Sequence, residues 1–132
     1  MARAPRDDAF APGAHIIEAY GAGGFRFAGL SHVGSILATP KGISAVEAAA
    51  LTELDATVFD RLFQELDEAP GCVEFVVLGS GAKMVATPPP LANALRTKNL
   101  RVETMATGAA SRVYNVMIDE GRRVAALLIA AP

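Results

Sequence analysis

Two glycine-containing turns carry the residues of this chain that could bind an anion or take part in chemistry. The first turn is Gly79, Ser80 and Gly81, which follows the apolar run 73–78. The second follows the shorter run 102–105 and consists of Thr107, Gly108, Ala109, Ala110, Ser111 and Arg112. Free N–H groups at the start of a helix, together with an arginine, bind phosphate or carboxylate groups. The two turns therefore predict a small-molecule or anion site between loops 79–81 and 107–112.

The first turn matches no complete catalytic or cofactor motif. Met84 stands where a dinucleotide fingerprint needs its third glycine, and the spacing of a Walker loop is absent. Leu78 stands where the Gly-x-Ser-x-Gly motif of serine hydrolases needs glycine. The two histidines, His15 and His32, have no Cys or His cluster near them, so they make a poor metal site. We expect no cofactor and no metal, and favour a non-enzymatic role, with glycines chosen for a tight turn as the simplest explanation.

The second turn has a structural alternative of its own. Thr107 could cap the following helix, and Arg112 could pair with a surface acid, since an arginine near a helix start opposes the helix dipole. Tyr114 and Asn115 lie further along that helix. Asn115 is a further candidate for binding because asparagine is a mediocre helix former.

The pattern of a strand, a glycine turn and a helix occurs twice, and it is the building unit of a parallel α/β sheet. Such sheets bind ligands beyond the carboxyl ends of their strands. The run 124–130 is apolar throughout, which is typical of a strand covered on both faces. Residues 15–46 instead predict short antiparallel strands, and the glycine-flanked segment 25–27 could offer an edge to a second copy.

Three helices are predicted from local signals. The first has Asp55 as its N-cap and apolar residues at three- and four-residue intervals up to Leu66. The second begins at the prolines 88–90 and ends at Asn99 in a left-handed conformation. The third spans 109–120, with an apolar stripe formed by Val113, Val116 and Met117.

Length and composition predict one domain over residues 15–132, preceded by a flexible tail at 1–14. The 132 residues are 52% hydrophobic, with a net charge of −2, and the isoelectric point is near 5.6. Without a basic surface, nucleic-acid binding is not expected. No apolar run approaches the roughly 20 residues that span a bilayer. These features, together with the single cysteine, Cys72, lead us to expect a soluble, cytoplasmic protein.

Several segments in a fixed order resemble a known family. They are 19–26, 77–81, the two prolines at 88–89, 107–116 and 120–126, of which 107–116 is the most specific. Over residues 15–130 the chain resembles a family of small α/β domains of unknown function. This family includes the mitochondrial complex I assembly factor three and an adipogenesis-associated domain protein.

The resemblance implies a three-layer α/β fold, with a central mixed, largely parallel sheet, helices and an added N-terminal β layer. It implies a binding or assembly-assisting protein whose partners are respiratory-complex subunits or assembly proteins. The family has no established catalytic residues. The positions of this chain that match its motifs are Gly79, Gly81, Thr107, Gly108, Ser111, Arg112, Tyr114 and Asn115. Ser80 and Ser111 stand where threonine and cysteine are expected in relatives.

Overall fold

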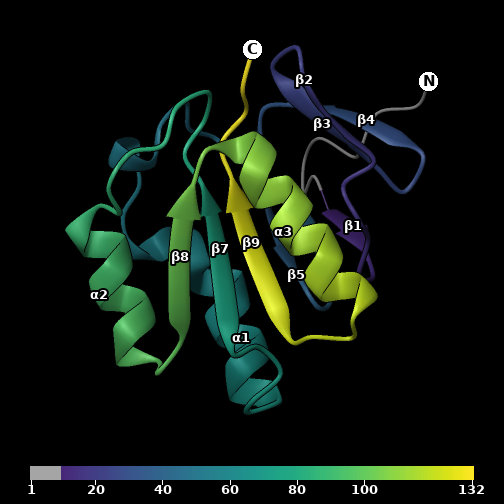
Figure 1. Cartoon of the computed structure of the whole chain (residues 1–132). Helices are drawn as coiled ribbons and strands as arrows, with labels where there is room; N and C mark the ends of the chain where they lie inside the picture. The colour runs from purple at the N-terminus through teal and green to yellow at the C-terminus, as the bar shows by residue number, and fades with distance from the viewer. Residues whose placement is uncertain (1–9) are drawn as a thin grey trace.

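The computed structural model describes residues 10–132, which form a six-stranded sheet, a three-stranded sheet and three α-helices (Figure 1). The large sheet has the order β1 (Phe10–Pro12), β6 (Gly42–Val46), β5 (Ser35–Thr39), β9 (Val124–Leu128), β7 (Phe75–Gly79) and β8 (Arg101–Met105). The small sheet has the order β2 (Ala19–Gly21), β3 (Gly24–Phe27) and β4 (Leu30–Val33).

The helices cover both faces of the large sheet. Two 3₁₀ turns, Leu51–Glu53 and Ala56–Phe59, lead into α1 (Asp60–Glu68), and with α2 (Pro89–Thr97) they cover one face. The other face carries α3 (Thr107–Asp119) together with the small sheet (Figure 1). The predicted three-layer α/β architecture, with its added β layer, is therefore confirmed.

The central sheet is mixed, as predicted, but its parallel part is smaller than predicted. β7 runs parallel to β8 and β9, whereas β5 is antiparallel to both β9 and β6. The reason lies in the connections. β7, α2 and β8 form one crossover unit and β8, α3 and β9 form a second, while β5 and β6 are joined by a short hairpin. A crossover connection makes the two strands that it joins parallel, whereas a hairpin makes them antiparallel.

Two cores lie on opposite faces of the large sheet. Beneath α3, Phe25 and Phe27 from the small sheet pack with Ala110 and Tyr114. Beneath α1 and α2, Leu62, Leu91 and Leu95 pack on the other face of the same strands. β9 contributes to both cores and is buried along its whole length, as its apolar sequence predicts.

The first half of the chain forms antiparallel strands, as expected, with two differences. β3 lies between β2 and β4, so segment 25–27 is not a free edge and the expectation of an edge there is wrong. Phe10–Pro12, within the predicted tail, forms β1 and pairs with β6. The rest of the tail, residues 1–9, lies outside the described residues.

Local signals locate the start of α2 and the cap that precedes α1. The Asp55 carboxylate accepts a hydrogen bond from the Thr57 N–H, but it caps the 3₁₀ turn Ala56–Phe59, which runs into α1 at Asp60. Prolines occupy the first positions of α2. Asn99 has the predicted left-handed conformation, with φ of 59°. The third helix begins at Thr107 rather than at Ala109. Its N-cap, Ala106, has no side chain that caps the helix.

Candidate functional site

The two predicted turns meet at the carboxyl ends of the parallel strands. The Ser80 N–H donates to the Met105 carbonyl over 2.9 Å, and the Thr107 N–H donates to the Gly81 carbonyl, also over 2.9 Å. Ser80 directly follows β7, while Met105 ends β8 and Thr107 begins α3. The structure therefore brings the two loops together at one rim of the sheet.

The Thr107 side chain fills the space between the two turns. It is fully buried, and its hydroxyl donates to the Ile129 carbonyl (2.6 Å) and accepts from the Gly81 N–H (2.8 Å). A Cβ at Gly79 would lie only 2.9 Å from the Thr107 Oγ1 and from the Leu128 side chain. Gly79, Gly81 and Thr107 thus form a closely packed junction, in which glycine is required at position 79 by the close approach of Thr107.

The Ser80 hydroxyl holds the loop that follows β7. It donates to the Lys83 carbonyl over 2.7 Å and accepts from the Val85 N–H over 3.2 Å. A serine nucleophile needs a base that takes its proton. Here the hydroxyl proton is directed at a backbone carbonyl, so Ser80 shapes its own loop.

Tyr20 of the small sheet covers the start of α3. A Cβ at Gly108 would lie 2.5 Å from the Tyr20 hydroxyl oxygen, so any other residue there would displace the ring from its present position. Arg112, which is exposed, donates to the same hydroxyl over 3.3 Å instead of pairing with an acid. Within residues 10–132 the N–H groups of Gly108 and Ala109 have no hydrogen-bond partner. These two amides, the phenol and the guanidinium are the groups at this rim that could meet an anion.

Tyr114 and Asn115 attach the segment before β2 to α3. The Asn115 side chain accepts from the Ile17 N–H (2.7 Å) and donates to the Ile17 carbonyl (2.8 Å), as a neighbouring strand would. The Tyr114 hydroxyl donates to the His15 carbonyl over 3.2 Å. Both residues contact a segment about a hundred positions away in the sequence, which accounts for an asparagine inside a helix.

Ser111 lies on the inner face of α3 and differs from the other candidate residues. It is 2% exposed, and its hydroxyl has no hydrogen-bond partner among the described residues. A buried polar group without a partner costs about 1–3 kcal/mol. The cost is consistent with our expectation of cysteine here in relatives, since a thiol behaves as a small apolar group.

The outer surface of α3 carries an apolar depression that we did not expect. The helix was predicted to carry an apolar stripe of Val113, Val116 and Met117. It fully buries Thr107, Ala110, Ser111 and Tyr114, whose mostly small side chains let it approach the sheet closely. Of the predicted stripe, Val113 and Met117 are half-buried against the core, and Val116 is exposed. The depression, which we call the α3 depression, is lined by Arg112, Val113, Val116, Met117, Glu120 and Arg122.

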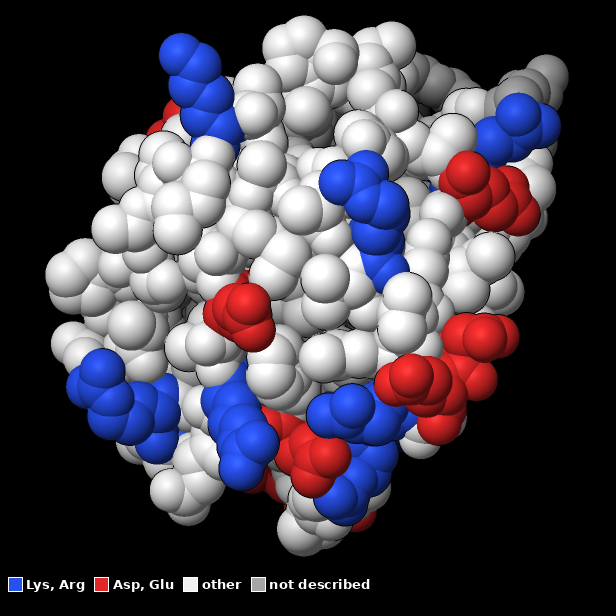
Figure 2. Space-filling model, viewed as in Figure 1, with Lys and Arg blue, Asp and Glu red and all other residues white. Residues whose placement is uncertain are grey.

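The face formed by α3 and β8 is poor in charge, although Arg112, Glu120 and Arg122 stand at the rim of the α3 depression itself. Figure 2 shows a broad uncharged area on the face formed by α3 and β8, interrupted by few charged side chains, while acidic and basic groups gather below it. Val116, which lines the depression, is 56% exposed. The sequence shows that Val116 lies among apolar residues of a helix. It does not show whether the Val116 side chain faces the sheet or the solvent.

A family model described as "Protein of unknown function (DUF498/DUF598)" matches residues 17–129. The chain belongs to this family. An uncharacterised family relative from Rhodobacter capsulatus is 39% identical over 129 residues, covering 98% of this chain and 94% of its own length.

Two solved structures share the fold of this family member. A Bartonella henselae protein described as an outer membrane protein is 39% identical, with a TM-score of 0.83, and the match covers 92% of this chain and 98% of that one. The Rpa2829 protein of Rhodopseudomonas palustris is also 39% identical, with a TM-score of 0.75 and coverage of 92% and 89%. In the described part of the present chain, no helix is both long and apolar enough to cross a bilayer.

Two substitutions in α3 should affect stability in opposite directions. Ser111→Ala should raise the free energy of unfolding by about 1 kcal/mol, because it removes an unpaired buried hydroxyl and alanine favours the helix.

Thr107→Val should lower the free energy of unfolding by roughly 2–4 kcal/mol, because the Gly81 N–H and the Ile129 carbonyl both lose their partner. Urea denaturation measures both values. A marked loss of stability in Ser111→Ala would show that its hydroxyl does have a partner.

Tyr114 should make the fold sensitive to alkali. Burial raises the pKa of Tyr114 from 10.0 to about 12. Between these values the unfolded chain has lost the phenolic proton and the folded chain keeps it, so stability should fall as pH rises, by about 1.4 kcal/mol per unit. Below pH 10 the group should have no such effect. Tyr114→Phe should remove this part of the pH dependence in urea titrations, and an unchanged slope would contradict the assignment.

Proposed function

We propose that this protein is a non-enzymatic binding domain that assists the assembly of a larger complex, and that the α3 depression is its docking site. The observation that carries the proposal is the apolar lining of the depression, in which Val116 is 56% exposed beside the half-buried Val113 and Met117. Apolar side chains surrounded by charged ones mark protein interaction sites. By the family resemblance, we propose respiratory complex I subunits or their assembly proteins as partners, and the cytoplasm as the location.

The state of the polar side chains at the rim supports a non-enzymatic role. Thr107 and Ser80 are engaged in hydrogen bonds that hold strand ends and loops, and Asn115 is bound to the backbone of Ile17. A catalytic acid, base or nucleophile has to be free to exchange protons with a substrate. These side chains are instead fixed in structural roles.

The chemistry of the α3 depression defines what should fit it. Its floor is aliphatic, and its rim carries Arg112 at one end and the Arg122–Glu120 pair, 3.8 Å apart, at the other. An amphipathic segment with aliphatic side chains on one face, flanked by charges of either sign, matches this surface.

Val116→Asp should abolish partner capture. The substitution places a charge on the apolar floor, where docking would bury it without a counter-ion. The measurement is affinity capture from the native host, with quantification of respiratory subunits and their assembly proteins. Folding of the variant is checked by thermal denaturation.

Val33→Asp is the matched control, because Val33 is 64% exposed but lies in β4 of the small sheet. Capture should be unchanged in this variant. Equal capture by both variants, or no enrichment of such partners by the wild type, would disprove the proposal.

A second candidate function is the binding of a small molecule or anion at the start of α3, between the loops 79–81 and 107–112, either as a binding protein or as an enzyme acting on that ligand. The free amides of Gly108 and Ala109, with the guanidinium of Arg112 and the hydroxyl of Tyr20, favour this candidate. In this arrangement an anion displaces the long Arg112–Tyr20 contact and gains a charge-assisted hydrogen bond.

Phosphate titration followed by amide NMR tests this second candidate. The Gly108 and Ala109 resonances should shift and saturate in the wild type. Arg112→Ala should weaken binding at least about tenfold, because it removes one charged hydrogen bond. Arg122→Ala, at the other end of α3, is the control and should bind as the wild type does. Unchanged binding by Arg112→Ala would rule out this site.

A further inference from the structure

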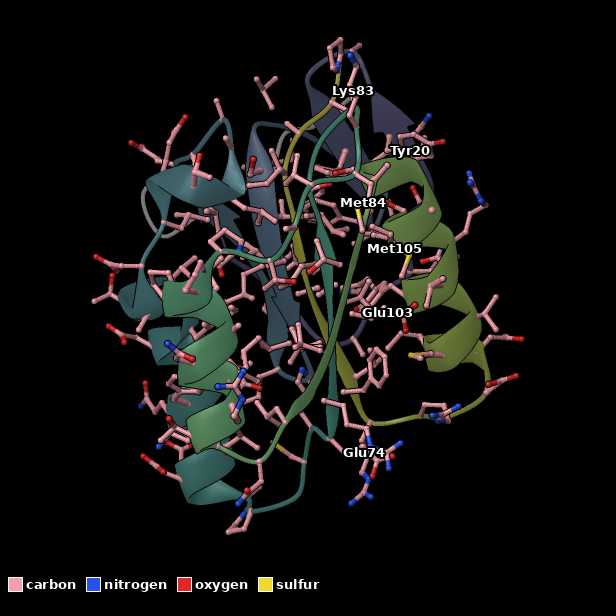
Figure 3. All side chains as sticks on the ribbon, turned by 60° about the vertical axis from the view of Figure 1, so that its left-hand side comes forward. Tyr20, Glu74, Lys83, Met84, Glu103 and Met105 are labelled. Carbon is pink, nitrogen blue, oxygen red and sulfur yellow. The ribbon has the colours of Figure 1, made fainter. Side chains whose placement is uncertain are left out.

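β8 leaves one edge of the large sheet open. It is the last strand in the order β1-β6-β5-β9-β7-β8 and pairs only with β7. Figure 3 shows this edge facing the viewer between α2 and α3, with Glu103 and Met105 along it. The opposite edge, β1, has three residues and ends in a proline. β8 is therefore the longer open edge of the described sheet.

The backbone groups of Val102 point away from the sheet. The Arg101 N–H donates to the Glu74 carbonyl, and the Met105 carbonyl accepts from the Ser80 N–H, so both residues direct their backbone groups toward β7. In a strand this direction alternates from residue to residue. Glu103 consequently also faces β7, while the N–H and C=O of Val102 and Thr104 face outward.

β8 has only part of the usual protection of an edge strand. Natural edges carry charged side chains, prolines or bulges that prevent pairing with another chain, and of these β8 has only the charges of Arg101 and Glu103. The sequence 101–105 contains no proline, glycine or lysine, and its pairing with β7 is continuous over all five residues. Thr104 is the exception, because its side chain lies 2.6 Å from that of Thr87, which brings the preceding loop to this end of the strand. The open stretch is thus centred on Val102.

The charges on β8 suit a second copy of the same strand. In an antiparallel pair of identical strands, opposed side chains lie on the same face, so the two-fold axis passes through one residue. An axis at Arg101 or at Glu103 places like charges opposite each other. An axis at Val102 places Arg101 of each copy opposite Glu103 of the other. Among the described residues neither Arg101 nor Glu103 forms an ion pair within the chain.

The direction of the backbone groups agrees with the same axis. With Val102 at the centre, its outward N–H and C=O exchange two hydrogen bonds with the Val102 of the second copy. Arg101 and Glu103 then occupy the positions without backbone hydrogen bonds, where opposed side chains are closest. Val102 is half-buried on the α2 face, so the two valines also touch there.

We propose that two copies of this chain associate through β8 in antiparallel register about Val102, joining their large sheets into one continuous sheet. The occupant of the open edge is a second copy, recognised by two symmetric Arg101–Glu103 pairs and by backbone hydrogen bonds. This inference is independent of the α3 depression and of its partner.

Exchanging the charges of Arg101 and Glu103 tests the register of the two β8 strands. Arg101→Glu alone, and Glu103→Arg alone, each turn two attractive pairs into two repulsive ones, and should weaken the dimer at least about tenfold. The double variant Arg101→Glu, Glu103→Arg restores both pairs and should dimerise as the wild type does. Both residues are exposed, so folding should be kept in every variant.

The readouts are sedimentation equilibrium from micromolar to millimolar concentration and hydrogen exchange of the Val102 amide. That amide should be protected in the wild type and in the double variant, but not in either single variant. Arg122→Glu changes the net charge by the same amount as Arg101→Glu, but at a position outside β8, and should leave the dimer intact. A wild type that stays monomeric throughout, single variants that dimerise normally, or a double variant that is not rescued would each overturn the proposal.

Discussion

The Thr107 hydroxyl is the interaction on which the arrangement of the rim depends. It is fully buried, and it connects the Ile129 carbonyl after β9 with the Gly81 N–H after β7, while Thr107 itself opens α3 after β8. One hydroxyl thus joins the ends of all three parallel strands. Because it serves both as donor and as acceptor, only serine or threonine could fill this role at similar size. Gly79 follows from it, since the approach of Thr107 leaves no room for a Cβ there.

The N-terminal layer depends on a different set of contacts, all made by α3. Asn115 pairs with both backbone groups of Ile17, Tyr114 reaches the His15 carbonyl, and Gly108 leaves room for Tyr20. The helix therefore binds the large sheet on one side and the small sheet on another. Two of its sides are occupied in this way. Val113 and Met117 lie half-buried against the core, and Val116 is left on the outer side.

Features set by local chemistry could be predicted from the sequence, and features set by distant partners could not. Asp55 as an N-cap, the prolines that open α2 and the left-handed Asn99 each follow from one residue and its neighbours. The two loops were expected together, because both follow parallel strands. The start of α3 was missed by two residues, since Thr107 bonds across the rim instead of capping its own helix. The apolar stripe was predicted, but the outward direction of Val116 was not. The side of α3 that faces the sheet is set by the small residues Ala110 and Ser111, which allow the closer contact.

What the molecule can bind depends on which of its polar groups lack a hydrogen-bond partner and on which of its apolar surfaces are exposed. An unpaired polar group or an exposed apolar surface is a source of free energy for binding, whereas a paired buried group gives little. At the rim, the hydroxyls of Thr107 and Ser80 and the amide of Asn115 already have partners. Among the groups that remain open to solvent in residues 10–132 are the backbone of Val102, the apolar floor of the α3 depression and the two amides at the start of α3. Two of these three surfaces offer backbone hydrogen bonds or aliphatic contact over an extended area, and such surfaces are complementary to another protein chain. Association through these open surfaces is therefore our proposal, while the paired polar side chains of Thr107, Ser80 and Asn115 hold the rim together.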